Sequence, residues 1–462
     1  MRIFQVIFLL ILFFGKAYSQ KPRLLITTDI GQDPDDQQSL VRWLHYANEF
    51  ELEGIVVNAD ANHANEAPVL KDSIVYALID RYEMIEKNLR LHHQYYPFAG
   101  DLRKTVKKGC AGNGVKVPVN QYIGDGKDTE GSDWILEKIK KHDSRPLDIS
   151  VWGGACDVAQ ALYKLKKEST PKQLENYLKN VRVFFIGKQD SSNDWVIGNF
   201  PDLWLVLGLH RGGDSWQSGY RGMFWGGNME NTSAHWLNEN IVGKNALTEL
   251  YPTKSYTGGV NKNPNNAMKE GDTPSWFYFL ENGLNSPSNP TFGGWGGRYL
   301  REQNQFFRDA DDTFYDEQTG KPETLPRATV FRWRDDFQND FANRVSWGSL
   351  PYARANHYPV IKLSGYQSEP NLKVTVKPGD KTEFDASASN DPDGYEIRFD
   401  WFFYPEAGNL NPLPALKTEG GKVSFTMPSV VEGNELHLIL KVTDNYHIPL
   451  CSYKRIIVKV EK

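Results

Sequence analysis

Short apolar runs alternate with amphipathic segments over the first part of the chain. Residues 24–28 and 53–57 have the length and the β-branched content of buried strands. Between them, apolar residues recur at the three-and-four spacing of a helix face, at Leu40, Trp43, Leu44 and Ala47. The alternation continues as helix, strand, helix and strand at 68–89, 147–152, 158–165 and 181–186. Strands separated by helices of this length predict an α/β fold with a mostly parallel sheet and flanking helices.

The pattern changes twice further along the chain. Residues 189–299 read as loops rich in Gly and Asn, with seven tryptophans: Trp195, Trp204, Trp216, Trp225, Trp236, Trp276 and Trp295. Long loops of this composition usually carry binding surfaces on a rigid sheet. Beyond Pro359 the pattern predicts short alternating strands at 372–376, 381–385, 398–403, 422–426, 435–442 and 454–460. We therefore expect an α/β domain over 20–358 and a C-terminal β-sandwich over 359–462.

Residues 1–19 have the pattern of a secretory signal peptide. Arg2 precedes an apolar run from 3 to 14, and small residues at Ala17 and Ser19 predict cleavage before Gln20. An uncleaved anchor is the alternative, although the run is shorter than a comfortable membrane span. We therefore expect an exported protein, periplasmic or secreted, whose mature form has no membrane span.

Charge and cysteine content narrow the classes of partner and fold. The net charge is −5, without the basic footprint that binds nucleic acid or anionic membrane. The three cysteines, at positions 110, 156 and 451, are too few for a disulfide framework. The sequence alone does not decide whether Cys110 and Cys156 form a disulfide bond.

The residues that indicate a function most specifically lie directly after the first predicted strand. Asp29, Asp33, Asp35 and Asp36 place four carboxylates within eight residues, at the sheet edge where α/β folds bind ligands. Like charges this close repel one another unless water or a cation compensates them. Because calcium prefers oxygen ligands of this kind, the loop predicts a calcium site, with a solvated surface turn as the alternative.

The segment 26–31, followed by Asp35 and Asp36, resembles the N-terminal signature of the nucleoside hydrolases. That calcium-dependent α/β family cleaves the N-glycosidic bonds of ribonucleosides. The resemblance implies that Asp29 and Asp36 bind calcium and that Asp35 is the base that contacts the attacking water. This chain has two extra residues between Asp29 and the Asp pair. The longer form resembles the nucleoside hydrolase-like domain of exported cellulose-binding proteins, and the resemblance extends over residues 23–350.

Later segments resemble other parts of the same family site. Cys156 stands at the position whose backbone carbonyl is a calcium ligand, and Asp272 stands where a further carboxylate completes the calcium shell. The loop with Asp190 and Asn193 corresponds to the loop that reaches the sugar hydroxyls. Asn58, near the end of the second predicted strand, is a further candidate for substrate binding.

One feature of the family is missing. Members that protonate the leaving base use a histidine directly before the aspartate that corresponds to Asp272, and this chain has Gly271 there. A ribonucleoside is therefore a doubtful substrate. Glu270 and His63 are the candidate replacement acids, and an ordinary surface or loop role is the alternative for both.

Two further features suggest a carbohydrate ligand. Trp225 and Trp295 are flanked by glycines, and an exposed indole face suits the apolar C–H face of a sugar. Burial in the core is the alternative for both. Residues 384–394, with 400–401 and 442–445, resemble the polycystic-kidney-disease (PKD) type of immunoglobulin-like sandwich, which exported carbohydrate-active proteins often carry.

Together these features predict an exported, calcium-dependent hydrolase of glycosyl bonds that acts on a glycan fragment or a glycoside. A non-catalytic protein that binds cellulose or another plant glycan is the alternative, which Gly271 favours. A periplasmic nucleoside hydrolase is a second alternative. Because nucleoside hydrolases often form oligomers, a homo-oligomer also stays open.

Overall fold

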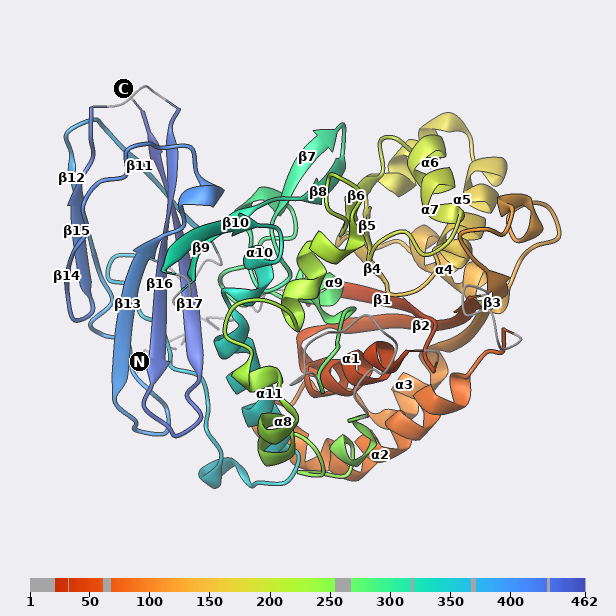
Figure 1. Cartoon of the computed structure of the whole chain (residues 1–462), viewed down its shortest axis with the longest axis horizontal. Helices are drawn as coiled ribbons and strands as arrows, with labels where there is room; N and C mark the ends of the chain where they lie inside the picture. The colour runs from red at the N-terminus through yellow and green to blue at the C-terminus, as the bar shows by residue number, and fades with distance from the viewer. Residues whose placement is uncertain are drawn as a thin grey trace, which may run out of the picture.

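The computed structural model has two parts, which lie side by side in Figure 1. It describes residues 21–31, 33–60, 68–253, 267–316, 320–366, 371–429 and 433–461. The predicted signal peptide and His63 lie outside these described residues. None of the helices within the described ranges combines the length and hydrophobicity needed to cross a lipid bilayer.

The first part is built on an eight-stranded sheet with the order β3-β2-β1-β4-β5-β6-β8-β7. All neighbouring strands from β3 to β8 run parallel, and β7 pairs antiparallel with β8 at one edge. The strands are β1 (Arg23–Thr28), β2 (Glu51–Asp60), β3 (Val106–Asn113), β4 (Leu147–Val151), β5 (Val181–Phe185), β6 (Trp204–Leu207), β7 (Tyr299–Gln303) and β8 (Phe306–Asp309). The strand order reverses at β1, which lies between β2 and β4. The crevice beyond the carboxyl ends of β1 and β4 is therefore the switch point where such sheets bind ligands.

Helices cover both faces of this sheet (Figure 1). They are α1 (Pro34–His45), α2 (Asp72–His92), α3 (Ala99–Thr105), α4 (Glu130–Lys140), α5 (Cys156–Glu168), α6 (Pro171–Leu178), α7 (Ser192–Asn199), α8 (Ala234–Asn240), α9 (Thr273–Phe277), α10 (Ala328–Phe331) and α11 (Arg334–Trp347). Side chains of β1 alternate between two cores: Leu24 and Ile26 pack with α1, α2, α9 and α11, and Leu25 packs with α4, α5 and α7. The predicted α/β class is confirmed.

The sequence analysis did not predict the helices and strands whose hydrophobic pattern is weak. β3 contains Lys107, Lys108, Gly109 and Gly112, and as an edge strand it exposes several of its side chains. The region 189–299, predicted as loops, contains α7, β6, α8 and α9, with single-turn helices such as η3 (Ser215–Gln217) and η4 (Gly219–Met223). A hairpin of β9 (Asp312–Asp316) and β10 (Lys321–Leu325) follows the sheet. These elements are short, so tertiary packing rather than local pattern defines them.

The C-terminal part is a sandwich of two sheets, with the orders β11-β17-β16-β13 and β12-β15-β14. Its strands are β11 (Asn371–Val376), β12 (Lys381–Asp385), β13 (Ile397–Phe403), β14 (Lys417–Glu419), β15 (Lys422–Thr426), β16 (Glu435–Asp444) and β17 (Cys451–Val460). Phe384, Trp401 and Leu440 are among the buried side chains between the sheets. All six predicted strands are present, and β14 is additional because its three exposed residues carry no apolar pattern. The predicted β-sandwich is confirmed.

The two parts share a continuous core. Tyr404 and Tyr453 of the sandwich belong to the same buried apolar cluster as side chains of α1, α9 and α11. Arg455 in β17 is fully buried and donates hydrogen bonds to the carbonyl oxygens of Leu284 and Gly293, over 2.9 and 2.8 Å. Separating the parts would leave this buried charge without its acceptors, so the interface is specific rather than a loose contact.

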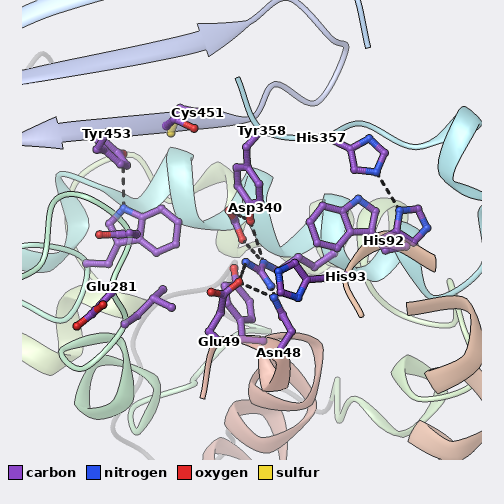
Figure 2. Close-up of a pocket in the computed structure, with 17 residues that line it drawn as sticks. Asn48, Glu49, His92, His93, Glu281, Asp340, His357, Tyr358, Cys451 and Tyr453 are labelled. Atoms are coloured by element: carbon purple, nitrogen blue, oxygen red, sulfur yellow. Dashed lines mark hydrogen bonds and ion pairs between the residues drawn. The ribbon is translucent and has the colours of Figure 1, made fainter. Parts of the chain in front are cut away.

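A cavity of about 370 Å³ lies between the two parts (Figure 2). Glu49, Asp340 and Arg344 line it, and Arg344 pairs with both carboxylates at 2.7 and 2.9 Å. Figure 2 also shows Tyr453 of β17 on the opposite wall. Because Glu49 lies two residues before the start of β2, the cavity lies at the amino edge of the sheet. It is therefore separate from the acidic loop, which lies at the carboxyl edge.

His45, at the end of α1, makes the stability of the fold sensitive to acid. The buried ring donates from Nδ1 to the carbonyl oxygen of Val41 over 2.8 Å, and Nε2 accepts from Asn245 over 3.0 Å. Burial lowers the pKa of His45 from 6.5 to about 4. Between these values the unfolded chain binds a proton that the folded protein does not. The free energy of unfolding therefore falls as the pH drops from 7 towards 4.

We expect His45→Gln to remove this contribution, which amounts to about 2 kcal/mol between about pH 7.5 and pH 5. The measurement is urea unfolding of wild type and variant at both pH values. His235→Gln is the control, because the His235 side chain is 82% exposed. An identical pH dependence in all three proteins would show that folded His45 binds its proton normally.

Candidate functional site

The acidic loop lies at the switch point of the sheet. Asp29 follows β1, Asp35 and Asp36 lie in the first turn of α1, and Asp272 directly precedes α9. Asp35, Asp36 and Asp272 each place one carboxylate oxygen within 4.8 Å of the others. Asp29 lies against the turn after β4, where a Cβ added to Gly153 would be 2.5 Å from its Oδ1. The fold thus gathers carboxylates from distant segments around one crevice.

The local sequence explains the shape of the loop. Gly31 has φ +95°, and a Cβ there would lie 2.5 Å from the Lys71 side chain, so only glycine fits. Pro34 is the first residue of α1, where its missing N–H leaves no hydrogen bond unmade. Asp35 and Asp36 follow in the first helical turn, where the helix N-terminus favours negative charge. Both acidic side chains are therefore aimed at the crevice by the start of α1.

Burial and mutual repulsion both raise the pKa values of these carboxyl groups. Burial, with the charges of the neighbouring aspartates, raises the pKa of Asp36 to about 8. The same two causes raise the pKa of Asp29 and of Asp272 well above the usual range. Lys269, whose Nζ lies 3.5 Å from Asp35 Oδ2, offsets part of this charge. The group still resists full ionisation in the absence of a further cation.

The donor atoms of the group fit a hard cation. Asp35 Oδ1 and Asp272 Oδ2 are buried and have no hydrogen-bond partner among the residues that the structure describes. A buried carboxylate oxygen without a donor is destabilising unless a cation compensates it. Calcium takes its ligands from carboxylates, carbonyls and water. The residues present therefore suit a calcium ion: Asp35, Asp36 and Asp272 lie close enough together to share one, and the predicted ligand Asp29 lies at the same crevice, near enough to Asp36 for the two charges to interact.

A second polar group surrounds the turn after β4. Asn58 Nδ2 donates to the carbonyl oxygen of Gly154 over 3.0 Å. A Cβ added to Gly154 would lie 2.5 Å from Asp190 Oδ2 and 2.7 Å from Asn113 Nδ2. Asn193 Oδ1 accepts from the backbone N–H of Asp190 over 3.2 Å. Each of the four side chains also has one buried polar atom that no described residue pairs with: Asn58 Oδ1, Asn113 Oδ1, Asp190 Oδ2 and Asn193 Nδ2. These atoms suit the hydroxyl groups of a sugar.

Asn113 is a site residue that the sequence analysis missed. It ends β3, a strand whose lysines and glycines hide it from an apolar pattern. The sequence feature that could have identified Asn113 is an amide side chain at the carboxyl end of the strand next to β2.

Cys156 is the first residue of α5, directly after the turn that follows β4. Its sulfur accepts a hydrogen bond from Asn113 Nδ2 over 2.8 Å. That its backbone carbonyl is a calcium ligand stays a prediction. All three cysteines are buried and free, so the bridge to Cys110 is absent.

Glu270 is a structural residue rather than an acid. Its carboxylate is fully buried, forms an ion pair with Arg42 and accepts a hydrogen bond from the Tyr251 hydroxyl over 2.6 Å. A group held between these partners cannot reach a substrate. The predicted role of Glu270 as proton donor to a leaving group is therefore wrong.

Gly271 leaves room for a side chain from another loop. A Cβ at this position would lie 3.3 Å from Asp35 Oδ2 and 3.7 Å from the ring of Tyr220, which belongs to η4. Burial and the charges of Asp35 and Asp272 raise the pKa of Tyr220. Its hydroxyl therefore stays protonated at neutral pH and can donate a hydrogen bond. The sequence analysis missed Tyr220 because only the fold brings η4 next to Gly271.

The two tryptophans predicted to stack on a sugar have different surroundings. Trp295 is 2% exposed and packs edge-on against Phe277 and Phe337, so its predicted role as an open stacking face is wrong. Trp225 is partly exposed, but the guanidinium of Arg327 lies 4.3 Å from its ring centre. A cation, rather than open solvent, therefore covers one face of Trp225.

Comparisons with known proteins agree with this architecture. The family model described as "Cellulose-binding Sde182, nucleoside hydrolase-like domain" matches residues 23–299. A second model, "Cellulose-binding protein Sde0182, C-terminal domain", matches residues 381–460. One solved structure is a nucleoside hydrolase-related hypothetical protein from Saccharophagus degradans that is associated with carbohydrate metabolism. It is 27% identical with a TM-score of 0.78, and the match covers 96% of this chain and 100% of that chain.

A more distant likeness concerns the sandwich. The solution structure of the PKD domain from the KIAA 1837 protein is 22% identical over 21% of this chain and 86% of that chain, with a TM-score of 0.16. A score of this size supports no conclusion about function. No curated protein matches the chain.

The repulsion among the carboxylates should make the calcium-free protein gain stability when one of them is neutralised. We expect Asp36→Asn to raise the free energy of unfolding in EDTA at about pH 8 by on the order of 1–3 kcal/mol. The folded-state pKa of Asp36, about 8, lies above its unfolded value. Stability is therefore lost as the pH rises towards 8, and the gain in the variant should shrink towards pH 4.

Urea unfolding in EDTA measures this effect. Asp202→Asn is the matched control, because Asp202 is exposed and far along the chain from the carboxylates. A lower unfolding free energy for Asp36→Asn than for wild type at pH 8 would contradict the repulsion.

Proposed function

Since the chain belongs to the nucleoside hydrolase-like family of cellulose-binding proteins, we propose that it is an exported, calcium-dependent hydrolase of glycosyl bonds. Its substrate is a glycan fragment or a glycoside rather than a ribonucleoside. The carbohydrate association of the Saccharophagus degradans relative supports this substrate class.

The observation that carries the proposal is the group of aspartates at the ends of β1 and the starts of α1 and α9. Ionised carboxylates crowded together in a buried crevice lower the stability of a fold, so a group of this kind indicates a functional site.

The aspartates divide into two roles. Asp29, Asp36 and Asp272 would hold the calcium ion, which when bound supplies a positive charge that orients sugar hydroxyls and water. Asp35 lies beside these ligands with one oxygen free of protein donors, so it can take the proton of the attacking water. Asn58, among the polar groups around Gly154, would bind sugar hydroxyls.

The leaving group would receive a hydrogen bond from Tyr220. This hydroxyl is a weak acid, because the pKa of Tyr220 is raised by burial and by the nearby carboxylates. A tyrosine in this place favours glycosides whose aglycone departs without strong protonation.

A second function, non-catalytic carbohydrate binding, is favoured by Gly271 at the position of the family acid. The family description also names cellulose binding. In that case the calcium ion would organise a binding crevice, and Asp35 would contact a sugar hydroxyl instead of a water.

The calcium assignment predicts a loss of metal in two variants. We expect wild type purified with calcium to retain one tightly bound ion, and Asp29→Ala and Asp36→Ala to lose it, because each removes a carboxylate ligand. Elemental analysis after gel filtration measures the content, with Asp202→Ala as the control. Unchanged calcium in both variants would refute the metal site.

Turnover separates the two functions. We expect Asp35→Asn to keep its calcium and its glycan binding but to lose about 100-fold or more of its hydrolytic rate. The measurement is a screen of plant and microbial glycans and aryl glycosides, scored by reducing ends and by co-sedimentation. Binding without turnover in wild type and variant alike would establish the binding protein instead.

A further inference from the structure

A cationic and aromatic cluster lies next to the carboxylates. It consists of Trp216, Arg221, Trp225 and Arg327, and is called the arginine–tryptophan cluster below. The Cζ atoms of Arg221 and Arg327 each lie 4.3 Å from the ring centre of a tryptophan, Trp216 and Trp225 respectively. The two indoles meet edge to face, with centroids 6.1 Å apart. All four side chains are partly exposed, so a solute can reach them.

The two arginines of the cluster have few protein partners. Arg221 Nε donates to the carbonyl oxygen of Ser215 over 2.7 Å. Within the described ranges, the buried Nε and Nη1 atoms of Arg327 have no hydrogen-bond partner, and no carboxylate forms an ion pair with this side chain. Asp214 and Glu323 act on Arg327 only from a greater distance, while burial and the charge of Arg221 lower its pKa. A desolvated guanidinium beside a like charge is stabilised by an anion.

Two of the four cluster residues, Arg221 and Trp225, lie on a loop that is rigidly held. Arg334 is fully buried and donates to the carbonyl oxygens of Gly226 and Asn228, both over 2.6 Å. Asp309 Oδ2 accepts from the backbone N–H of Gly219 over 2.8 Å. These bonds fix both ends of the segment between Gly219 and Asn228. Arg221 and Trp225 are therefore preorganised for a ligand rather than part of a flexible surface patch.

Tyr220 connects the cluster to the carboxylates. Its ring lies beside Gly271, next to Asp35, and the Cζ atom of Arg221 lies 5.1 Å from its centre. A ligand with one sugar at the carboxylates would therefore extend across Tyr220 towards Arg327. Negative charge at one end and positive charge at the other would orient a charged ligand in one direction only.

We propose that the arginine–tryptophan cluster is a subsite for an anionic substituent of the glycan, a carboxylate or a sulfate ester. The substituent is carried by a sugar adjacent to the one at the carboxylates. Guanidinium groups pair with such anions through two parallel hydrogen bonds. This inference rests on the proposed function and narrows its substrate class to acidic glycans, whereas cellulose is neutral.

The test compares three trisaccharides in calcium-containing buffer: tri-galacturonate, a sulfated galactose trisaccharide and cellotriose. Calorimetry and tryptophan fluorescence report binding, because two indoles belong to the cluster. We expect wild type to bind one of the acidic trisaccharides at least about 10-fold more tightly than cellotriose. We expect Arg327→Met to abolish this preference while changing the affinity for cellotriose less than about 2-fold. The preferred acidic ligand identifies the substituent.

Matched variants make the test specific. Arg354→Met, at the exposed end of η8 (Tyr352–Arg354), should behave as wild type. Arg221→Met provides the same comparison if Arg327→Met does not fold. Equal affinity for acidic and neutral trisaccharides, or an unchanged preference in the arginine variants, overturns the subsite and leaves the hydrolase proposal standing. No binding to any trisaccharide, together with no bound calcium, overturns both.

Discussion

The buried ion pair between Arg42 and Glu270 holds together the two segments that supply the carboxylates. Arg42 belongs to α1, which begins with the acidic pair, and Glu270 lies two residues before Asp272. The same guanidinium donates to the carbonyl oxygen of Phe337 in α11 over 3.1 Å and lies 4.0 Å from the Phe341 ring centre. Losing one partner of such a pair typically costs about 3–5 kcal/mol. The distances among the aspartates therefore depend on the ion pair of Arg42, a side chain that does not itself contact a ligand.

This arrangement separates two kinds of acidic residue that look alike in the sequence. Glu270 adopts φ 20°, a conformation unusual for a residue with a side chain, and the ion pair holds it there. Asp272 follows after a single glycine and has a buried oxygen without a donor. One carboxylate is fully compensated and supports the fold, while the other is left uncompensated for a cation. Glu270 thus stabilises the fold, while Asp272, two residues further along the chain, is available to bind a cation.

Sequence-based prediction was most reliable for residues directly after a strongly apolar strand. Asp29 comes directly after such a run, so its place at the carboxyl edge of the sheet could be inferred, and the family resemblance is confirmed by the match over 23–299. Asn113 could not be found because β3 lacks such a run. Glu270 was misassigned because its partner lies 228 residues away in the chain. Burial and pairing with distant residues leave no local pattern in the sequence. The incorrect prediction of an open stacking face for Trp295 has the same cause.

The shared core of the two parts has a consequence for how the protein is made. β16 and β17 bring Ile439 and Tyr453 into the apolar cluster that also contains side chains of α9 and α11. During synthesis, the helices at this side of the α/β part emerge long before those strands do. Their apolar surface stays exposed until the sandwich arrives, so the nascent chain completes its folding late and exposes an apolar surface that a chaperone can bind.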